Sequence, residues 1–141
     1  MYRVGVLLIA STLTGCGTDP QRTQFNNSAV IAKKKDVVWE SLLDYFTRNN
    51  IQIKTIEKDS GVIYAERASF DAGMADCGEA PIARELVRSA SLNVFVRSQQ
   101  GGTQVSVNTT FAIVRSFDNQ SWKAECFSTG ALEREILNAI G

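Results

Sequence analysis

The side chains with the widest range of possible chemistry in this chain are its three cysteines, Cys16, Cys77 and Cys126. A thiol can be acylated, oxidised to a disulfide, or deprotonated to bind a metal or attack a substrate. Nucleophilic pairs of the Ser-His or Cys-His kind are excluded because the chain has no histidine. It also lacks a glycine-rich phosphate loop, a lipase-type serine elbow and a Cys-x-x-Cys motif. We therefore expect a protein that is not an enzyme and carries no cofactor.

Cys16 ends a short apolar leader. One positive residue, Arg3, precedes an apolar stretch of signal-peptide length, and Leu13-Thr14-Gly15-Cys16 closes it. This pattern resembles the lipobox of bacterial lipoproteins. The resemblance implies that residues 1–15 are a signal peptide, and that Cys16 is acylated, with palmitate-type chains, and tethers the protein to a membrane. Because Gly17 follows the cysteine in place of aspartate, it also implies the periplasmic face of the outer membrane, with the inner membrane as the alternative. An ordinary signal peptide with an incidental cysteine, or a short N-terminal anchor, is the competing interpretation.

The other two cysteines, Cys77 and Cys126, form an even pair in an exported chain. Exported proteins meet an oxidising compartment, where such pairs commonly become disulfides. Free thiols or a redox pair are the alternatives. A reactive thiol needs a nearby cation or helix N-terminus, and Asp76 and Glu79 around Cys77 disfavour its thiolate. We therefore predict a structural disulfide.

Acidic side chains suggest two further possibilities, a metal site and an acid/base pair. Asp71, Asp76 and Glu79 could ligate a hard cation, but they lack the alternating carboxylates of a calcium loop. A solvated loop is the favoured interpretation, and no metal is expected. Glu133 and Glu135 are two residues apart on a predicted helix and so point in different directions.

Charge and aromatic residues bear on possible partners. The 15 basic and 15 acidic residues balance, so no nucleic-acid partner is expected. Lys33-Lys34-Lys35 could touch anionic lipid, or simply form a solvated turn. Trp39 could contact a ligand, although its helical spacing is more typical of a core. Phe117 and Trp122 flank a predicted turn, where they could pair across a hairpin or present an aromatic patch to an envelope protein.

Hydrophobic periodicity predicts one α+β domain over residues 28–141, after a flexible polar tether at 16–27. A helix begins with Asp36 as its N-cap and ends at Asn49-Asn50. A second helix is capped by Ser128 or Thr129. The element order is β-α-β-β-β-β-(β)-α, with a long loop at 68–88 after the third strand. This order predicts an antiparallel sheet of about five strands with two helices packed on one face.

The same layout is similar to the helix-grip domains of a lipoprotein of the outer-membrane barrel-assembly machine. The shared features are a Trp-containing helix with Trp39, a hairpin that turns at Gly61, and a closing helix over residues 129–140. The likeness concerns layout alone and implies no particular function.

Two functions remain open. The first is a non-enzymatic envelope lipoprotein that acts through protein contacts, as an accessory to a membrane assembly. The second is a periplasmic module that binds a lipid or other apolar ligand between helices and sheet. A wide pocket lined by Trp39, Leu43, Val94 and Val107 would favour the ligand, whereas a filled core with an exposed aromatic patch would favour protein contacts.

Overall fold

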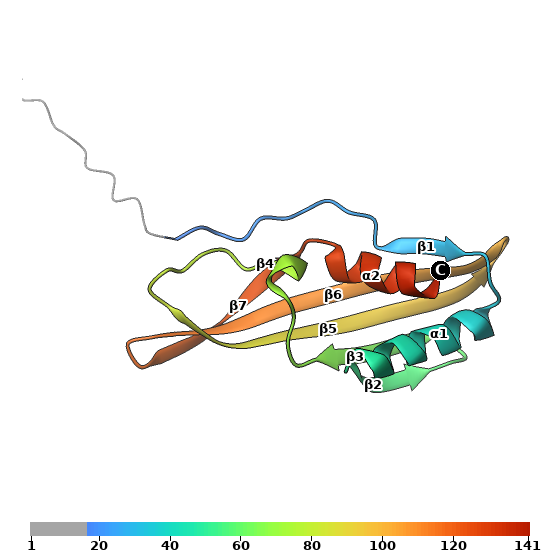
Figure 1. Ribbon diagram of the computed structural model, residues 1–141, viewed down its shortest axis with the longest axis horizontal. Coiled ribbons are helices and arrows are strands. Elements are labelled where there is room, and N and C mark those ends of the chain that lie inside the picture. The colour runs from blue at the N-terminus through green and yellow to red at the C-terminus, as the bar shows by residue number, and fades with distance from the viewer. Residues whose placement is uncertain (1–16) are drawn as a thin grey trace, which may run out of the picture.

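Seven strands and two α-helices make up the fold in the computed structural model, which describes residues 17–141 (Figure 1). The predicted signal peptide and Cys16 lie outside the described residues. The elements in chain order are β1 (Ser28–Ile31), α1 (Lys35–Arg48), β2 (Gln52–Glu57), β3 (Val62–Arg67), the single-turn helix η1 (Ala72–Met74), β4 (Ala75–Asp76), β5 (Arg84–Gln99), β6 (Gly102–Phe117), β7 (Gln120–Ser128) and α2 (Ala131–Ile140).

The sheet is antiparallel throughout, with strand order β2-β3-β5-β6-β7-β4. Strand β5 lies along one edge of β6, and the other edge is shared by β1, at Thr103–Ser106, and β7, at Phe111–Phe117. The predicted α+β class, the antiparallel sheet and the two helices are confirmed. The expected number of about five strands is too low, because β7 is a full strand and the two-residue β4 pairs with its end.

Both helices follow from the spacing of their apolar residues. In α1 the buried positions are Val38, Trp39, Leu42 and Phe46, and in α2 they include Leu132, Ile136, Leu137 and Ile140. The predicted N-caps of both helices need correction. Gly130, and not Ser128 or Thr129, is the N-cap of α2, and Lys34 is the N-cap of α1, with Asp36 in the first turn. In the first turn, the carboxylate of Asp36 still interacts favourably with the positive end of the helix dipole. The predicted end of the helix is confirmed, with Asn50 in the left-handed region at φ 53°.

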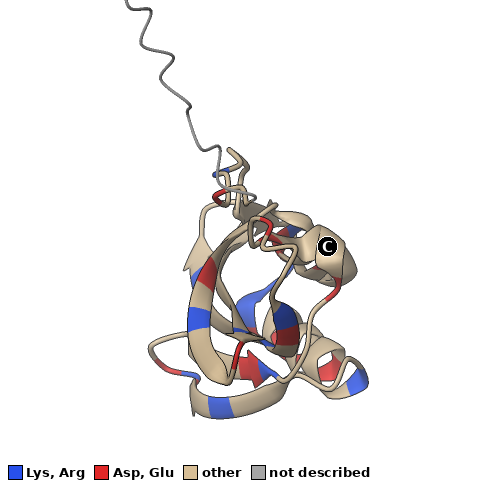
Figure 2. Ribbon diagram, turned by 90° about the vertical axis from the view of Figure 1, so that its left-hand side faces the viewer, with Lys and Arg blue, Asp and Glu red and all other residues tan. Residues whose placement is uncertain are grey.

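The helices cover one face of the sheet, here called the inner face. Alternating side chains of β5 and β6 point into it, and those most completely buried are Leu92, Val94, Val96, Val105, Val107 and Phe111. The opposite, open face carries mostly polar residues of the same strands. Viewed along the long axis, the strands curve, and residues of both charge signs are mixed around the ribbon (Figure 2).

The long hairpin extends past the helices. Strands β5 and β6 have 16 residues each, or roughly 50 Å at the usual rise of a strand. Helix α1 has 14 residues and α2 has 10, or roughly 21 and 15 Å. One end of the sheet, where β6 turns into β7, therefore lies beyond both helices (Figure 1).

Toward that end of the sheet, the loop between β3 and β5 covers the inner face where the helices do not. The segment between β3 and β5, expected to be irregular, contains η1 and β4. Phe70 packs edge-on against Phe111, with ring centroids 4.8 Å apart, and Met74 is buried. The loop therefore covers part of the inner face that α1 and α2 do not reach.

Candidate functional site

A disulfide joins the loop to the sheet. Cys77 and Cys126 are bonded with their Cα atoms 4.2 Å apart, as the sequence predicts. Arg115 of β6 is only 8% exposed, and its Nη2 donates hydrogen bonds to the carbonyl oxygens of Cys77, at 3.1 Å, and Gly78, at 2.8 Å. One covalent bond and two charge-assisted hydrogen bonds therefore fix this corner of the loop.

The segment Gly17–Asn27, here called the N-terminal strap, lies against the same corner. Thr18 and Glu79 exchange backbone hydrogen bonds, 3.2 Å from Thr18 N to Glu79 O and 2.9 Å from Glu79 N to Thr18 O. Gly78 permits this approach, because a Cβ on it would lie 2.2 Å from the carbonyl oxygen of Thr18. The sequence predicts a flexible tether at 16–27, whereas the described part of that segment runs along the domain.

Further along the strap, Asp76 accepts hydrogen bonds from two backbone N–H groups. Its Oδ1 accepts from Gly78, at 2.9 Å, and its Oδ2 accepts from Gln21, at 3.0 Å. These two bonds lower the pKa of the Asp76 carboxyl below its ordinary value. Both carboxylate oxygens of Asp76 therefore have hydrogen-bond donors, and the bond from Gln21 links β4 to the strap. Within residues 17–141, no three His, Cys, Asp or Glu side chains are grouped so that they could hold a metal ion.

The two acids of α2 do not converge on a common site. The Tyr45 hydroxyl donates to Oε1 of Glu135 at 2.6 Å, which connects α1 to α2, and burial together with this bond raises the pKa of Tyr45. Glu133 is only 1% exposed and points to the sheet, where it accepts hydrogen bonds from Ser128, at 2.8 Å, and from Thr109. Sequence reasoning separates the two directions correctly but does not reveal the burial of Glu133.

The three aromatic candidates lie in two different environments. Trp39 is 2% exposed and belongs to the core, which is the interpretation that its helical spacing favours. Phe117 and Trp122 are 49% and 41% exposed, at the end of the sheet beyond the helices. Trp122 lies opposite Arg115 in the β6–β7 pair, and Phe117 lies opposite Gln120, so the two aromatic residues are not direct cross-strand partners.

Three further apolar side chains are exposed near the same end. Together with Phe117 and Trp122 they form the surface called here the apolar tip: Ile82, Leu86, Val87, Phe117 and Trp122. Sequence reasoning misses the first three because it treats residues 68–88 as a loop. No clean alternation marks the start of β5, because residues 84–88 read Arg-Glu-Leu-Val-Arg and the strand has an irregularity between Glu85 and Val87.

A hollow on the open face is the second candidate surface. Its volume is about 440 Å³, and its lining combines one aromatic ring with polar groups: Asn27, Phe95, Arg97, Gln104, Ser106 and Asn108. Asn27 belongs to the strap, and its side-chain amide donates to Oδ1 of Asn108 at 2.7 Å. The strap therefore runs from the disulfide corner to the open-face hollow.

The space between helices and sheet is filled by side chains. Trp39, Val94 and Val107, expected to line a ligand pocket if there is one, are 2%, 0% and 0% exposed, and Leu43 packs partly buried against the same cluster. Among residues 17–141, no helix is both long and apolar enough to span a bilayer. No protein-family model and no curated protein matches the chain.

Proposed function

We propose that the chain is a non-enzymatic bacterial envelope lipoprotein that acts through protein contacts, as an accessory to a membrane assembly. Acyl chains on Cys16 would hold it at the periplasmic face of the outer membrane. The support for the anchor is the sequence Leu13-Thr14-Gly15-Cys16 at the end of an apolar leader. The disulfide between Cys77 and Cys126 agrees with an oxidising compartment such as the periplasm.

The observation that carries the protein-contact proposal is the filled core. An apolar ligand would need space among the side chains of Trp39, Val94 and Val107, which instead pack against the rest of the core. Close-packed protein cores have little room for even one extra methylene group without strain. The filled core therefore favours recognition at the surface of the domain over an apolar ligand held between the helices and the sheet.

The open-face hollow is the surface that best fits a protein partner. Interfaces gain most of their affinity from a few aromatic and arginine residues surrounded by polar groups. Phe95 is half-buried there, Arg97 is exposed beside it, and the amides of Gln104 and Asn108 supply donors and acceptors. No helix covers this face of the sheet within the described residues, so an approaching protein can reach it directly.

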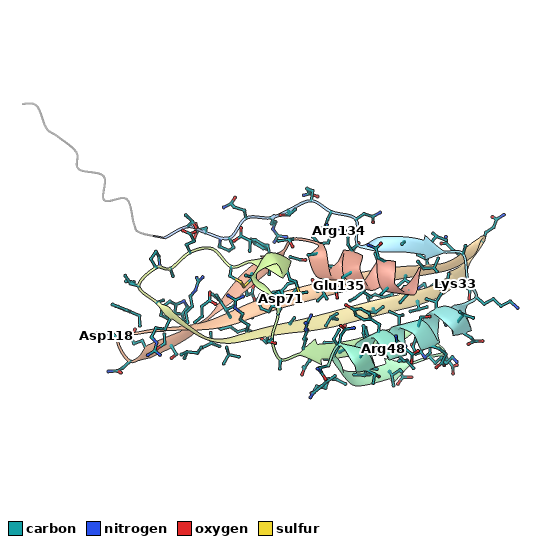
Figure 3. All side chains as sticks on the ribbon, in the orientation of Figure 1. Lys33, Arg48, Asp71, Asp118, Arg134 and Glu135 are labelled. Carbon is teal, nitrogen blue, oxygen red and sulfur yellow. A yellow bond between two sulfur atoms is a disulfide. The ribbon has the colours of Figure 1, made fainter. Side chains whose placement is uncertain are left out.

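Affinity purification of the lipidated protein from crosslinked membranes tests this proposal. We expect a defined partner to be recovered with the wild type, and its recovery to fall at least about fivefold with Arg97→Ala, in the range of an interface side chain that contributes binding energy. Arg48→Ala is the matched control, because Arg48 lies on α1, away from the open face, and its side chain is 78% exposed (Figure 3). The proposal fails if the protein is recovered alone, or if Arg97→Ala and Arg48→Ala recover the partner equally.

A further inference from the structure

The apolar tip holds five of the eight large apolar side chains that are exposed among the described residues; the other three, Val30, Val37 and Ile56, belong to β1, α1 and β2. Its side chains range from 41% exposed at Trp122 to 70% exposed at Ile82. Single exposed apolar residues are normal on soluble domains, but several near one another mark an interaction surface. Leu86 and Val87 lie at the start of β5 and Ile82 precedes that strand, whereas Phe117 ends β6 and Trp122 belongs to β7. Strand β6 pairs with β5 on one side and with β7 on the other, so the five residues lie toward the same end of the sheet.

The N-terminal strap brings the start of the described chain to this end. Thr18 pairs with Glu79, and Glu79 precedes Ile82 by three residues, a span of at most about 10 Å. Glu79 and Arg115 also line a common hollow, and Arg115 lies opposite Trp122. Cys16 is the residue before Gly17. The described chain begins toward the end of the sheet where β6 turns into β7 (Figure 1), so an anchor on Cys16 would be attached to the domain at that end.

The three consecutive lysines Lys33, Lys34 and Lys35, here called the lysine cluster, lie at the end of the molecule away from the apolar tip. Figure 3 places Asp118, in the β6–β7 turn, and Lys33 at opposite ends of the long axis. Lys33 Nζ donates to the carbonyl oxygens of Ile140 and Gly141, at 3.3 and 2.8 Å, and Lys35 Nζ donates to that of Lys58 at 3.0 Å. The length of β6 puts roughly 50 Å between this cluster and the tip, several Debye lengths in physiological salt. Of the two interpretations that the sequence leaves open for these lysines, the structure favours the solvated turn.

Charge does not dominate the surface around the tip. Basic and acidic residues alternate there, and Arg88 pairs with Glu85 at 2.7 Å. Seen from this end, the ribbon carries both signs without a patch of one sign (Figure 2). A contact made by the tip would therefore depend on apolar and aromatic side chains, and would change little with salt or with the charge of the lipid.

From this placement we propose that the apolar tip rests on the surface of the lipid bilayer, with Phe117 and Trp122 among the headgroups. Tryptophan favours this region because its ring is apolar and carries one polar N–H group, and the apolar ring of Phe117 would be removed from water beside it. Acyl chains and a second membrane contact together also hold a protein in one orientation. In this orientation the open-face hollow lies to the side of the domain, away from the bilayer, where a periplasmic partner can reach it. The inference rests on the proposed anchor at Cys16, since the anchor brings the tip to the membrane.

Trp122 supplies a reporter that needs no substitution. The chain has two tryptophans, and Trp39 is buried, so Trp122 is the one that an aqueous quencher such as acrylamide reaches. The lipidated protein, purified from membranes, is reconstituted into phosphatidylcholine vesicles that contain no other protein. We expect acrylamide quenching of Trp122 to fall about threefold or more relative to the protein in solution, and brominated phosphatidylcholine to quench the same emission.

Two variants make this measurement specific. Trp122→Phe should remove the quenchable emission. Arg48→Trp in the Trp122→Phe protein places the reporter on α1, where acrylamide should quench it equally with and without vesicles. Vesicles with added phosphatidylglycerol should give the same shielding as phosphatidylcholine alone, because the contact is apolar.

The outcomes separate the tip from the anchor. If the protein is acylated and bound to vesicles but Trp122 stays open to acrylamide, the tip inference is wrong and the anchor stands. Shielding of Trp122 that appears only after a protein partner is added would likewise overturn it, and would make the tip a protein interface. If the purified protein carries no acyl chains, the proposed anchor is wrong; coupling the Cys16 thiol to a maleimide phospholipid then supplies the tether, and the same quenching decides the tip inference.

Discussion

Removing the disulfide between Cys77 and Cys126 should destabilise the domain and loosen one end of it before the other. The bond connects residues 49 apart in the chain, and the chain-entropy relation gives roughly 4 kcal/mol for a loop of that length as an upper value. Other contacts of the loop remain: Arg115 to two carbonyls, Phe70 against Phe111, and the Thr129 hydroxyl to the carbonyl of Gly73 at 2.7 Å. We therefore expect a loss of about 2–4 kcal/mol for the double variant Cys77→Ser/Cys126→Ser.

Equilibrium unfolding in urea measures this loss, and it should correspond to a melting temperature lower by about 10 °C. Hydrogen exchange shows where the loss acts. Amides of β4 and of Thr18 and Gln21 in the strap should lose protection first, because the disulfide corner holds both. Amides of α1 and of β5 beside β3 should keep theirs until global unfolding.

Reduced wild-type protein is the control, since it loses the bond without losing either cysteine side chain. It should resemble the serine double variant in stability and in exchange pattern. The prediction is refuted if reduction or substitution changes the unfolding free energy by less than about 0.5 kcal/mol, or if α1 loses protection before the strap does.

Three further predictions concern the core, the buried acid and the strap. Trp39→Ala should lower the unfolding free energy in urea by about 3–5 kcal/mol, because Trp39 is 2% exposed between α1 and the sheet; a loss below about 1 kcal/mol would contradict its place in the core. Glu133→Ala should cost about 1–3 kcal/mol in the same assay, because the hydroxyls of Ser128 and Thr109 lose their acceptor. Glu133→Gln should cost less, because its amide oxygen still accepts; equal costs would show that the hydrogen bonds do not matter. Because its hydrogen bonds lower the pKa of Asp76 in the folded protein, the stability it contributes is fully present above the ordinary value of 3.8 and is lost as the pH falls through the lowered folded value. The amide resonances of Gln21 and Gly78, followed by NMR from pH 6 to pH 2, should shift in that acidic range in the wild type and stay unchanged in Asp76→Asn.

The elements that the sequence predicts well are those in which local pattern and tertiary packing agree. Helix α2 has an apolar stripe that ends buried as expected, and Asn50 takes the left-handed conformation that its residue type permits. The disulfide between Cys77 and Cys126 follows from the cysteine count and from the oxidising compartment that the leader predicts. For the helix and its end, local periodicity and residue type are sufficient to make the prediction, and for the disulfide the number of cysteines left to pair is sufficient.

The features that sequence reasoning misses depend on contacts between distant segments. Strand β4 has two residues and pairs with the end of β7 directly beside the disulfide between Cys77 and Cys126. The strap follows the domain because Thr18 meets Glu79, 61 residues away. Exposure of Phe117 and Trp122 depends on how far the helices reach along the sheet, which no local pattern encodes.

The state of Cys16 in the mature protein is the most direct test of the proposed anchor. Mass spectrometry of the protein extracted from membranes should show a chain that begins at Cys16 and carries a diacylglycerol thioether on its sulfur, and Cys16→Ser should leave the membrane fraction or remain uncut. A mature chain that begins at another residue, or a Cys16→Ser protein that is processed and held at the membrane like the wild type, would contradict it.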